Sequence, residues 1–330
     1  MKGIHVNWTK PFFDRDRLRG HGFRATRDIK GKCYDQPNYQ ILYTILSAGL
    51  WKLHNGTIKL YTDSIGFNFY QQFGINDLYD EVNISFLDGY SKGNVDPARF
   101  WTSGKIKVLA NQKEPFVFMD QDMIIRQPIP DYILEGDITA THWEIPRGYY
   151  YFEEQDWERE IKHIDFPTNY NCSDLCPNTS FLAVNNMELN REYTNWHKKL
   201  VETNGNDVPE WFWLLTDQGI LGHVIREGDY KANTLTDKVF LANSNYASKE
   251  ERHKGKSEQW YMPLGATNQK DKDISWEHVW FNKIHFNLYP EFLKGETKRY
   301  FRECVELGLG KYLQHSRFKK DWDEYNNTDN

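Results

Sequence analysis

The chain has 330 residues, of which 39% are hydrophobic and 27% charged, with a mean hydropathy of −0.77 and a net charge of −6. This length allows one large α/β domain or two smaller ones, with a substantial buried core. No window approaches the roughly 18 apolar residues of a membrane-spanning helix. The acidic balance, without a long basic block, argues against nucleic acid as the main partner.

The N-terminus and the cysteines indicate a cytoplasmic protein. The first residues turn polar after a few positions, so we expect no secretory signal peptide. Four cysteines are few and suit a reducing compartment. The aromatic content of 16%, with 12 Trp and 20 Tyr, favours a carbohydrate or nucleotide ligand, although aromatic rings also fill cores.

The first 125 residues alternate between strand and helix patterns, which predicts a doubly wound, nucleotide-binding α/β half. We expect strands at 3–8, 57–62, 81–85 and 116–119, and helices at 38–54, 67–73 and 97–111. A basic, glycine-rich segment at 15–32 is expected to be a surface loop.

After Pro130 the alternation loosens. We expect strands at 137–141 and 180–184, and helices at 190–202, 216–224 and from 290 to the end. The segments 149–157 and 245–272 are predicted to be loops that select an acceptor. Together these patterns predict an α/β fold with a central mixed sheet flanked by helices and a C-terminal helical appendage.

The stretch from Phe116 to Ile125 carries the strongest functional signal. Four apolar residues run directly into Asp120 and Asp122, and three apolar residues follow. Such a run indicates a strand buried on both faces, and open α/β sheets bind ligands at the carboxyl ends of such strands. Carboxylates are costly there unless a divalent cation compensates them. The alternative is a strand-end turn rich in Asp.

Three other Asp-x-Asp pairs occur, at positions 14/16, 271/273 and 321/323. They lie in polar surroundings rich in Lys or Arg, and we interpret them as solvated surface pairs. Only the pair at 120/122 closes a buried strand, so it is the candidate metal site.

With this motif the chain resembles the GT-A glycosyltransferases, in particular the glycogenin and bacterial lipopolysaccharide galactosyltransferase type. Three further short motifs fit the resemblance, which covers residues 3–285. The strand end Tyr61-Thr62-Asp63 is similar to a base-contacting strand end. Asn178-Thr-Ser-Phe181 looks like the segment that carries an Asn toward the sugar. Thr216-Asp217-Gln218 resembles an Asp-Gln pair that opens a helix beside the reacting centre.

The resemblance implies a GT-A-like fold and a metal-dependent hexosyltransferase of polysaccharide biosynthesis. Its donor would be a nucleotide sugar, with a UDP-sugar favoured, and its acceptor a glycan or glycolipid. Mn²⁺ or Mg²⁺ would accept the charge that develops on the leaving diphosphate. Asp122 would bind the metal directly, and Asp120 would reach both the metal and the ribose. A retaining mechanism is favoured, and the stereochemistry stays open.

A late histidine completes the expected metal site. In the resembled family, His-x-x-Gly-x-x-Lys supplies a third metal ligand and a lysine for the diphosphate. Here His278 is followed by Phe281 in the glycine place, and Lys283 comes one residue early. His278 is the expected ligand and Lys283 the expected phosphate contact, with His285 as a competing ligand. His278 could also be a histidine within an aromatic cluster.

The expected nucleotide contacts lie at predicted strand ends. Asn7, Trp8 and Asp63 share one edge of the sheet with Tyr61 and Thr62, and each could instead be a turn or packing residue.

The lysines before the buried strand are further candidates for the phosphates. Lys105 and Lys107 are two apart on a helix, so only one can face the site, and we take Lys107 as the phosphate contact.

The expected catalytic residues are Asn178, Asp217 and Gln218. Asp217 would orient the acceptor hydroxyl or assist at the anomeric carbon. Its alternative role is that of a negative charge at a helix N-terminus.

Three other classes of protein compete with this interpretation. A sugar-phosphate nucleotidyltransferase would share the architecture but normally carries an early glycine-rich loop after a strand. A glycoside hydrolase usually draws its two carboxylates from separate elements. A non-catalytic carbohydrate-binding protein would explain the aromatic content but not the buried acidic strand end.

The predicted domains are a catalytic domain at 1–288, divided into a nucleotide-binding half (1–125) and an acceptor-binding half (126–288), and a helical tail at 289–330. Basic residues of the tail between Arg317 and Lys320 offer a weak peripheral contact with an anionic membrane.

Overall fold

The structure is a computed structural model. It describes residues 1–14, 33–90, 95–97, 99–145, 166–167, 169–171, 174–204, 212–237, 239–241, 274–279 and 290–328. The loops predicted at 15–32, 149–157 and 245–272 lie outside the described residues, as do Lys283 and His285.

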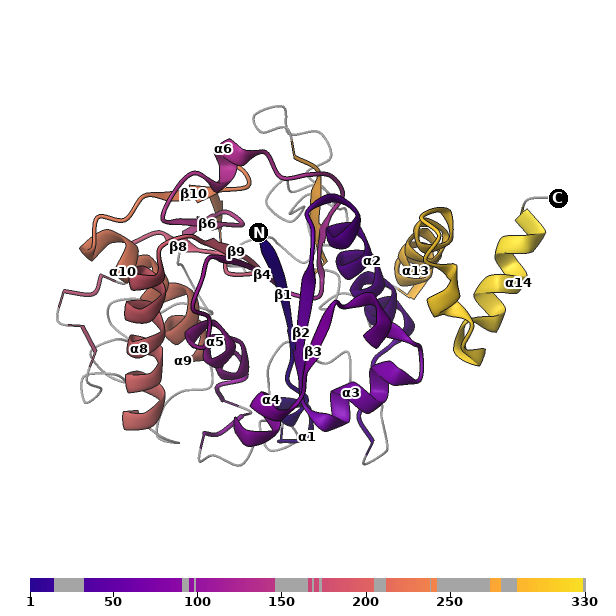
Figure 1. The fold of residues 1–330 in the computed structure, drawn as a ribbon, viewed down its shortest axis with the longest axis horizontal. Helices are drawn as coiled ribbons and strands as arrows, with labels where there is room; N and C mark the ends of the chain where they lie inside the picture. The colour runs from indigo at the N-terminus through magenta and orange to yellow at the C-terminus, as the bar shows by residue number, and fades with distance from the viewer. Residues whose placement is uncertain are drawn as a thin grey trace. The chain divides into compact units, whose positions relative to one another are not determined.

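Hydrogen bonds join seven strands in one sheet, in the order β10 (Ala232–Thr234), β6 (Ile138–Ala140), β9 (Phe181–Val184), β4 (Phe116–Met119), β1 (Lys2–Asn7), β2 (Ile58–Thr62) and β3 (Glu81–Asn83). The sheet is mixed, because β1, β2 and β3 pair in parallel whereas β6 and β9 pair antiparallel. Helices flank the strands (Figure 1), and the predicted α/β fold class with C-terminal helices is therefore confirmed.

The chain divides into two compact units. The terminal unit comprises Lys2–Ser91, Met119–Pro128 and Trp276–Asn330, and the middle unit comprises Met1, Lys92–Phe118 and Ile129–Ser275. The domain boundaries drawn from the sequence stay a prediction.

The terminal unit is built on three parallel strands, whose buried apolar side chains include Ile4, Ile58 and Leu60. Its strands are β1 (Lys2–Asn7), β2 (Ile58–Thr62), β3 (Glu81–Asn83), β5 (Met123–Ile125) and β12 (Trp276–His278). Its helices are α1 (Lys10–Asp14), α2 (Asn38–His54), α3 (Ser64–Gln71), α4 (Ser85–Tyr90), α13 (Pro290–Glu306) and α14 (Lys319–Thr328), with 3-10 turns at Ile75–Leu78, Gly310–Leu313 and Ser316–Phe318. All of β2 is buried, and α2 packs between β5 and α13.

The middle unit combines short strands with amphipathic helices. Its strands are β6 (Ile138–Ala140), β7 (Trp143–Ile145), β8 (Cys176–Pro177), β9 (Phe181–Val184), β10 (Ala232–Thr234) and β11 (Val239–Leu241). Its helices are α5 (Ser103–Ala110), α6 (Asp131–Leu134), α8 (Met187–Asn204), α9 (Phe212–Leu214) and α10 (Ile220–Glu227), with a π-helical turn at Leu215–Gly219. Strand β4 (Phe116–Met119) lies where the two units meet in sequence.

Several elements follow the sequence closely and others do not. The helix at 38–54 and the strand at 116–119 have the predicted bounds. The helix expected from Pro97 begins only at Ser103, because residues before it form turns. The helix expected at 67–73 begins three residues earlier, since Asp63 caps it at Gly66.

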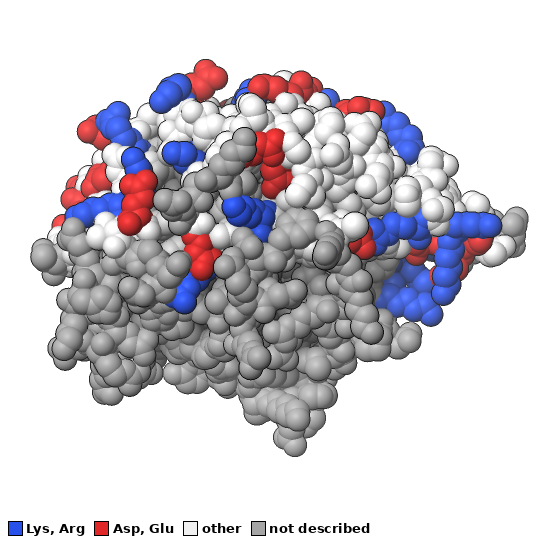
Figure 2. All heavy atoms as spheres, turned by 90° about the horizontal axis from the view of Figure 1, so that it is seen from below, with Lys and Arg blue, Asp and Glu red and all other residues white. Residues whose placement is uncertain are grey.

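Among the described residues, no helix is long and apolar enough to cross a bilayer. On the face drawn in Figure 2, basic and acidic side chains are interspersed over much of the described surface.

Candidate metal and nucleotide site

The acidic turn lies between β4 and β5. After Met119 the chain turns at Gln121 and Asp122, and the amide of Met123 donates to the Asp120 carbonyl at 2.9 Å. Asp122 is 4% exposed and Asp120 is half-buried. A four-residue turn between two buried strands therefore holds one carboxylate inside the terminal unit and leaves the other within reach of solvent.

Strand β12 brings His278 to this turn. It pairs antiparallel with β5, so that Met123 lies opposite His278, and the Val279 amide donates to the Asp122 carbonyl at 2.9 Å. The His278 Nε2 lies 3.9 Å from the Asp122 Oδ1. This distance is too long for a hydrogen bond.

The three side chains fit a divalent cation. Ligand atoms of Asp120, Asp122 and His278 all lie within 4.8 Å of one another. Two ligands bound at about 2.1 Å to one octahedral ion lie roughly 3.0 to 4.2 Å apart, which includes the 3.9 Å separation of His278 and Asp122. Two carboxylates and one imidazole are a donor set that suits a divalent cation.

A chain of hydrogen bonds connects His5 of β1 to the backbone at the end of the acidic turn. His5 of β1 contacts the Tyr79 hydroxyl at 3.0 Å and the Ser47 hydroxyl at 3.1 Å, and Ser47 donates to the Met123 carbonyl. Burial lowers the pKa of His5 to about 3, against the opposing effect of Asp122, so His5 is neutral at pH 7. Burial, with Asp122 as the next cause, raises the pKa of Tyr43. The Asp122 charge thus acts within a buried environment.

A second network of the terminal unit ends in three buried amide atoms. Tyr34 donates to Asn7 Oδ1 at 2.9 Å, Gln36 Nε2 donates to the hydroxyls of Tyr34 (2.7 Å) and Tyr70 (3.3 Å), and Tyr70 donates to Gln121 Oε1 at 2.9 Å. The opposite amide atoms, Asn7 Nδ2, Gln36 Oε1 and Gln121 Nε2, have no hydrogen-bond partner among the described residues. They are two donors and one acceptor, of which Gln121 Nε2 belongs to the acidic turn and Asn7 Nδ2 lies against Gly66 of α3.

The sequence pointed to Asn7 but missed the other members of this network. They come from distant segments, and no local pattern marks them. The same holds for His5 and Ser47.

The residues expected to hold the nucleotide also have structural roles. Asp63 caps α3 through Gly66 and accepts from the Thr9 amide at 2.8 Å. Thr62 donates to the Asn7 carbonyl at 2.9 Å, and Tyr61 is buried. Trp8 packs on Tyr90, with ring centroids 5.3 Å apart. Their contact with a base or ribose stays a prediction.

The middle unit holds a separate buried cluster around Asp217. Lys105 lies 2.7 Å from Asp217 Oδ2, and the Tyr193 hydroxyl donates to Oδ1 at 2.7 Å. Lys105 also donates to the Thr179 hydroxyl at 2.8 Å. Of the two lysines on α5, Lys105 is therefore the inward-facing one, whereas Lys107, which we expected to contact phosphate, is exposed.

Asn178 is held next to this cluster by Glu144. Its Nδ2 donates to Glu144 Oε1 at 2.8 Å, and its Oδ1 accepts from the Ser180 amide at 3.1 Å. His142 lies 3.0 Å from the same Glu144 oxygen. Hydrogen bonds with neighbouring buried polar groups thus fix the orientation of the Asn178 amide.

The prediction that Asp217 and Gln218 open a helix is wrong. Helix α9 precedes them, and both lie in the π-helical turn Leu215–Gly219 that continues into α10. The extra residue of a π-helical turn leaves local carbonyls for other partners, and such turns are frequent at functional sites. Here the Thr216 carbonyl is 2.8 Å from His197 Nδ1. Asp217 is therefore not a charge at a helix N-terminus.

The fold and this site define a mixed α/β protein with a candidate divalent-cation centre at the end of a buried strand. Residues 1–294 match the model of DUF6734, a family of unknown function, and the chain belongs to that family. No curated protein matches the sequence.

Several solved structures are similar to this chain, all at low identity. The galactosyltransferase LgtC, in complex with donor and acceptor sugar analogues, is 12% identical over 80% of this chain and 81% of its own, with a TM-score of 0.37. Mouse xyloside xylosyltransferase 1 is 8% identical over 71% and 85%, with a TM-score of 0.35. A nucleoside-diphosphate-sugar pyrophosphorylase from Vibrio cholerae RC9 is 10% identical over 73% and 93%, with a TM-score of 0.34.

Proposed function

We propose that the protein is a glycosyltransferase that moves a sugar from a nucleotide sugar, most simply a UDP-sugar, to a hydroxyl of a glycan or glycolipid. The observation that carries the proposal is the convergence of Asp120, Asp122 and His278 at the end of a buried strand. Open α/β sheets bind their ligands at such strand ends.

The three side chains would hold Mn²⁺ or Mg²⁺, with manganese favoured by the imidazole. A bound divalent ion supplies positive charge for the leaving diphosphate oxygens. The pairing of β12 with β5 already brings His278 to 3.9 Å from Asp122, so the two ligands need little reorganisation to bind it. Asp120, which is half-buried, is the carboxylate that can also reach a ribose hydroxyl.

The buried amide network supports a uracil nucleotide. A uracil edge presents two carbonyl acceptors on either side of one N–H donor. Asn7 Nδ2 and Gln121 Nε2 are donors and Gln36 Oε1 is an acceptor, so these atoms include the kinds of group that a uracil edge requires. Unpartnered buried polar atoms each cost about 1–3 kcal/mol, so a base that pairs with them is stabilised. Because the three atoms are buried, the side chains over them must shift when the base enters.

Asn178, Asp217 and Gln218 belong to the proposal as the residues that position the reacting sugar and the acceptor. Asn178 and Asp217 are pre-oriented by Glu144 and by Lys105 with Tyr193, as preorganised contacts require. The same proposal includes a retaining outcome and contacts of Lys107 and Lys283 with the diphosphate. It also includes His285 as an alternative metal ligand.

The experiment is a screen of nucleotide sugars for release of the free nucleoside diphosphate, with Mn²⁺, Mg²⁺ or EDTA. We expect release from at least one UDP-sugar with Mn²⁺, none with EDTA, and a rise in melting temperature when Mn²⁺ and UDP are added together. The same samples are tested for pyrophosphate release from UTP and a sugar 1-phosphate. Activity in that assay alone, or nucleotide release that persists in EDTA, would contradict the proposal.

A further inference from the structure

Strand β12 presents His278 to the acidic turn and its neighbour Glu277 to the C-terminal helix. Adjacent side chains of a strand point to opposite faces. His278 lies 3.9 Å from Asp122, whereas Glu277 is 1% exposed and lies against α13. One short strand therefore carries a candidate metal ligand on one face and a buried charge on the other.

Four hydrogen bonds hold the Glu277 carboxylate. Tyr300 and Arg299 of α13 donate to Oε1, each at 2.7 Å, and Arg299 donates a longer bond to Oε2 at 3.3 Å. Arg126, the residue after β5, donates to Oε2 at 2.7 Å. Bonds to an ionised group of this kind are about twice as strong as neutral ones. Glu277 is thus anchored to both its partner strand and α13.

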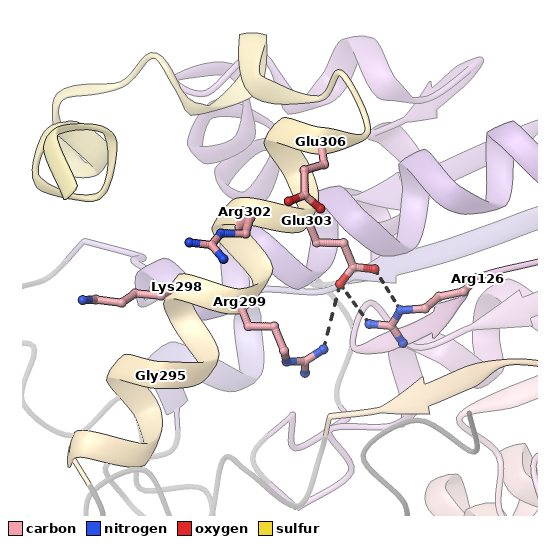
Figure 3. Close-up of a pocket in the computed structure, with 7 residues that line it drawn as sticks. All are labelled: Arg126, Gly295, Lys298, Arg299, Arg302, Glu303 and Glu306. Carbon is pink, nitrogen blue, oxygen red and sulfur yellow. Dashed lines mark hydrogen bonds and ion pairs between the residues drawn. The ribbon is translucent and has the colours of Figure 1, made fainter. Parts of the chain in front are cut away.

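Glu303 completes the anchor. It accepts from Arg126 Nε at 2.8 Å and Nη2 at 3.1 Å, and Arg299 lies 3.9 Å from it. Figure 3 shows Arg126 and Arg299 pointing toward Glu303. These residues line a groove of about 540 Å³, together with Gly295, Lys298, Arg302 and Glu306. The four groups Arg126, Arg299, Glu277 and Glu303 form what we call the α13 charge cluster.

The α13 charge cluster fixes the register of β12. A shift by one residue would exchange the two faces, moving Glu277 to the side of Asp120 and Asp122 and His278 to the side of the arginines. Such a shift would be unfavourable for two reasons. The Glu277 carboxylate would lie beside the carboxylates of the acidic turn, and the arginines would lose their buried anionic partner. The strand has three residues, so its own ladder gives little resistance to slippage.

We propose that Glu277, held by Arg126 and Arg299, is a positioning residue that sets His278 in place as a metal ligand. The inference rests on the proposed metal site, and it adds a structural role for the C-terminal helix α13 in metal affinity. Groups that hydrogen-bond to metal ligands typically change metal affinity by about 10- to 100-fold when they are mutated. Glu277 acts on His278 through the strand, so we expect the lower end of this range.

The test measures Mn²⁺ binding to the full-length protein by calorimetry and by the electron paramagnetic resonance of free Mn²⁺, without any substrate. We compare the wild type, Asp122→Ala, Glu277→Gln and Arg317→Gln. Arg317 is the matched control, because it also anchors the C-terminal region, and its partners Asp35 and the Gln36 carbonyl do not belong to the α13 charge cluster. We expect Glu277→Gln to weaken Mn²⁺ binding by about tenfold and Arg317→Gln to change it by less than about twofold.

Each outcome decides the inference. If Asp122→Ala abolishes binding while Glu277→Gln binds as the wild type does, the metal site stands and the positioning role is overturned. An equal loss in Arg317→Gln at matched melting temperature also overturns it. A wild type that binds no Mn²⁺ overturns both the metal site and the inference. If Glu277→Gln does not fold, Arg299→Gln replaces it, because Arg126 then still holds Glu277, and a loss of several-fold is expected.

Discussion

Two buried carboxylates of this protein, Asp217 in the middle unit and Asp122 in the terminal unit, are stabilised differently. Asp217 has a lysine ammonium and a tyrosine hydroxyl at hydrogen-bond distance, each at 2.7 Å. Asp122 has an imidazole at 3.9 Å and a second carboxylate, Asp120, in the same group. Asp217 is thus paired with a cation of the protein itself, whereas Asp122 belongs to a group of side chains with the geometry of a metal-ligand set.

The difference separates a positioning role from a metal-binding role. A carboxylate that is paired inside the protein keeps its orientation and its charge without help from solution. Two carboxylates and an imidazole within 4.8 Å gain the most from a divalent ion. The stability of the first cluster should therefore be independent of added metal, and that of the second should depend on it. The following experiments test this contrast, from the largest expected effect to the smallest.

Lys105→Met should lower the free energy of unfolding by about 3–5 kcal/mol, because it leaves Asp217 charged and buried without its cation. The measurement is urea denaturation with and without Mn²⁺, and the loss should be the same in both. Lys107→Met, on the exposed side of the same helix, is the control and should change stability by less than about 0.5 kcal/mol. Similar losses in both variants would show that the Lys105–Asp217 pair contributes no more to the free energy of unfolding than an exposed lysine does.

Asp122→Ala should reduce turnover by about 10²-fold or more and remove the stabilisation by Mn²⁺. Initial rates at saturating metal and thermal shift with Mn²⁺ measure the two effects. Asp323→Ala changes another Asp-x-Asp pair, on α14, and should leave both unchanged. Near-normal turnover of Asp122→Ala at saturating metal would refute the metal-binding role.

Asn7→Asp should weaken UDP binding by about tenfold, since it replaces a buried donor by an acceptor, a loss of about 1.4 kcal/mol. Titration calorimetry with UDP and CDP should also show a smaller preference for UDP, because cytosine carries an amino donor in place of one uracil carbonyl. Asn68→Asp, on the exposed side of α3, serves as the control. An unchanged UDP affinity would indicate that the amide network has only a structural role.

His197→Gln should reduce the dependence of stability on pH. Burial lowers the pKa of His197 to about 4. The Thr216 carbonyl and Asp217 raise this pKa, and Lys105 lowers it further. The pKa of His197 is lower in the folded protein than its unfolded value of about 6.5. The contribution of neutral His197 to the free energy of unfolding is therefore fully present above pH 6.5 and is lost as the pH falls toward 4. The wild type should lose about 1 kcal/mol more than the variant between pH 6.5 and 5.5. Equal slopes in denaturation at these two pH values would contradict this.

Membrane contact by the basic tail also stays a prediction. Arg317 already pairs with Asp35 at 2.5 Å and donates to the Gln36 carbonyl at 2.8 Å. Its side chain therefore has a role within the terminal unit.

Local patterns were sufficient for the elements that one face or one run of apolar residues defines. The helix at Asn38–His54, the strand at Phe116–Met119 and the acidic pair that follows it could be predicted because helical spacing and an unbroken apolar run are properties of neighbouring residues. The same patterns missed the short strands β5 and β12, whose three residues each are too few to show a period.

Tertiary structure alone decided which residues act together. The pairing of β12 with β5 selected His278 as the neighbour of Asp122, and helix α9 placed Asp217 within a helix and not at its start. Packing of α5 turned Lys105 inward and Lys107 outward. The sequence determined where carboxylates follow a buried strand, because that depends on chain order. Their partners come from residues distant in the chain, and only the register of paired strands and the packing of helices bring such residues together.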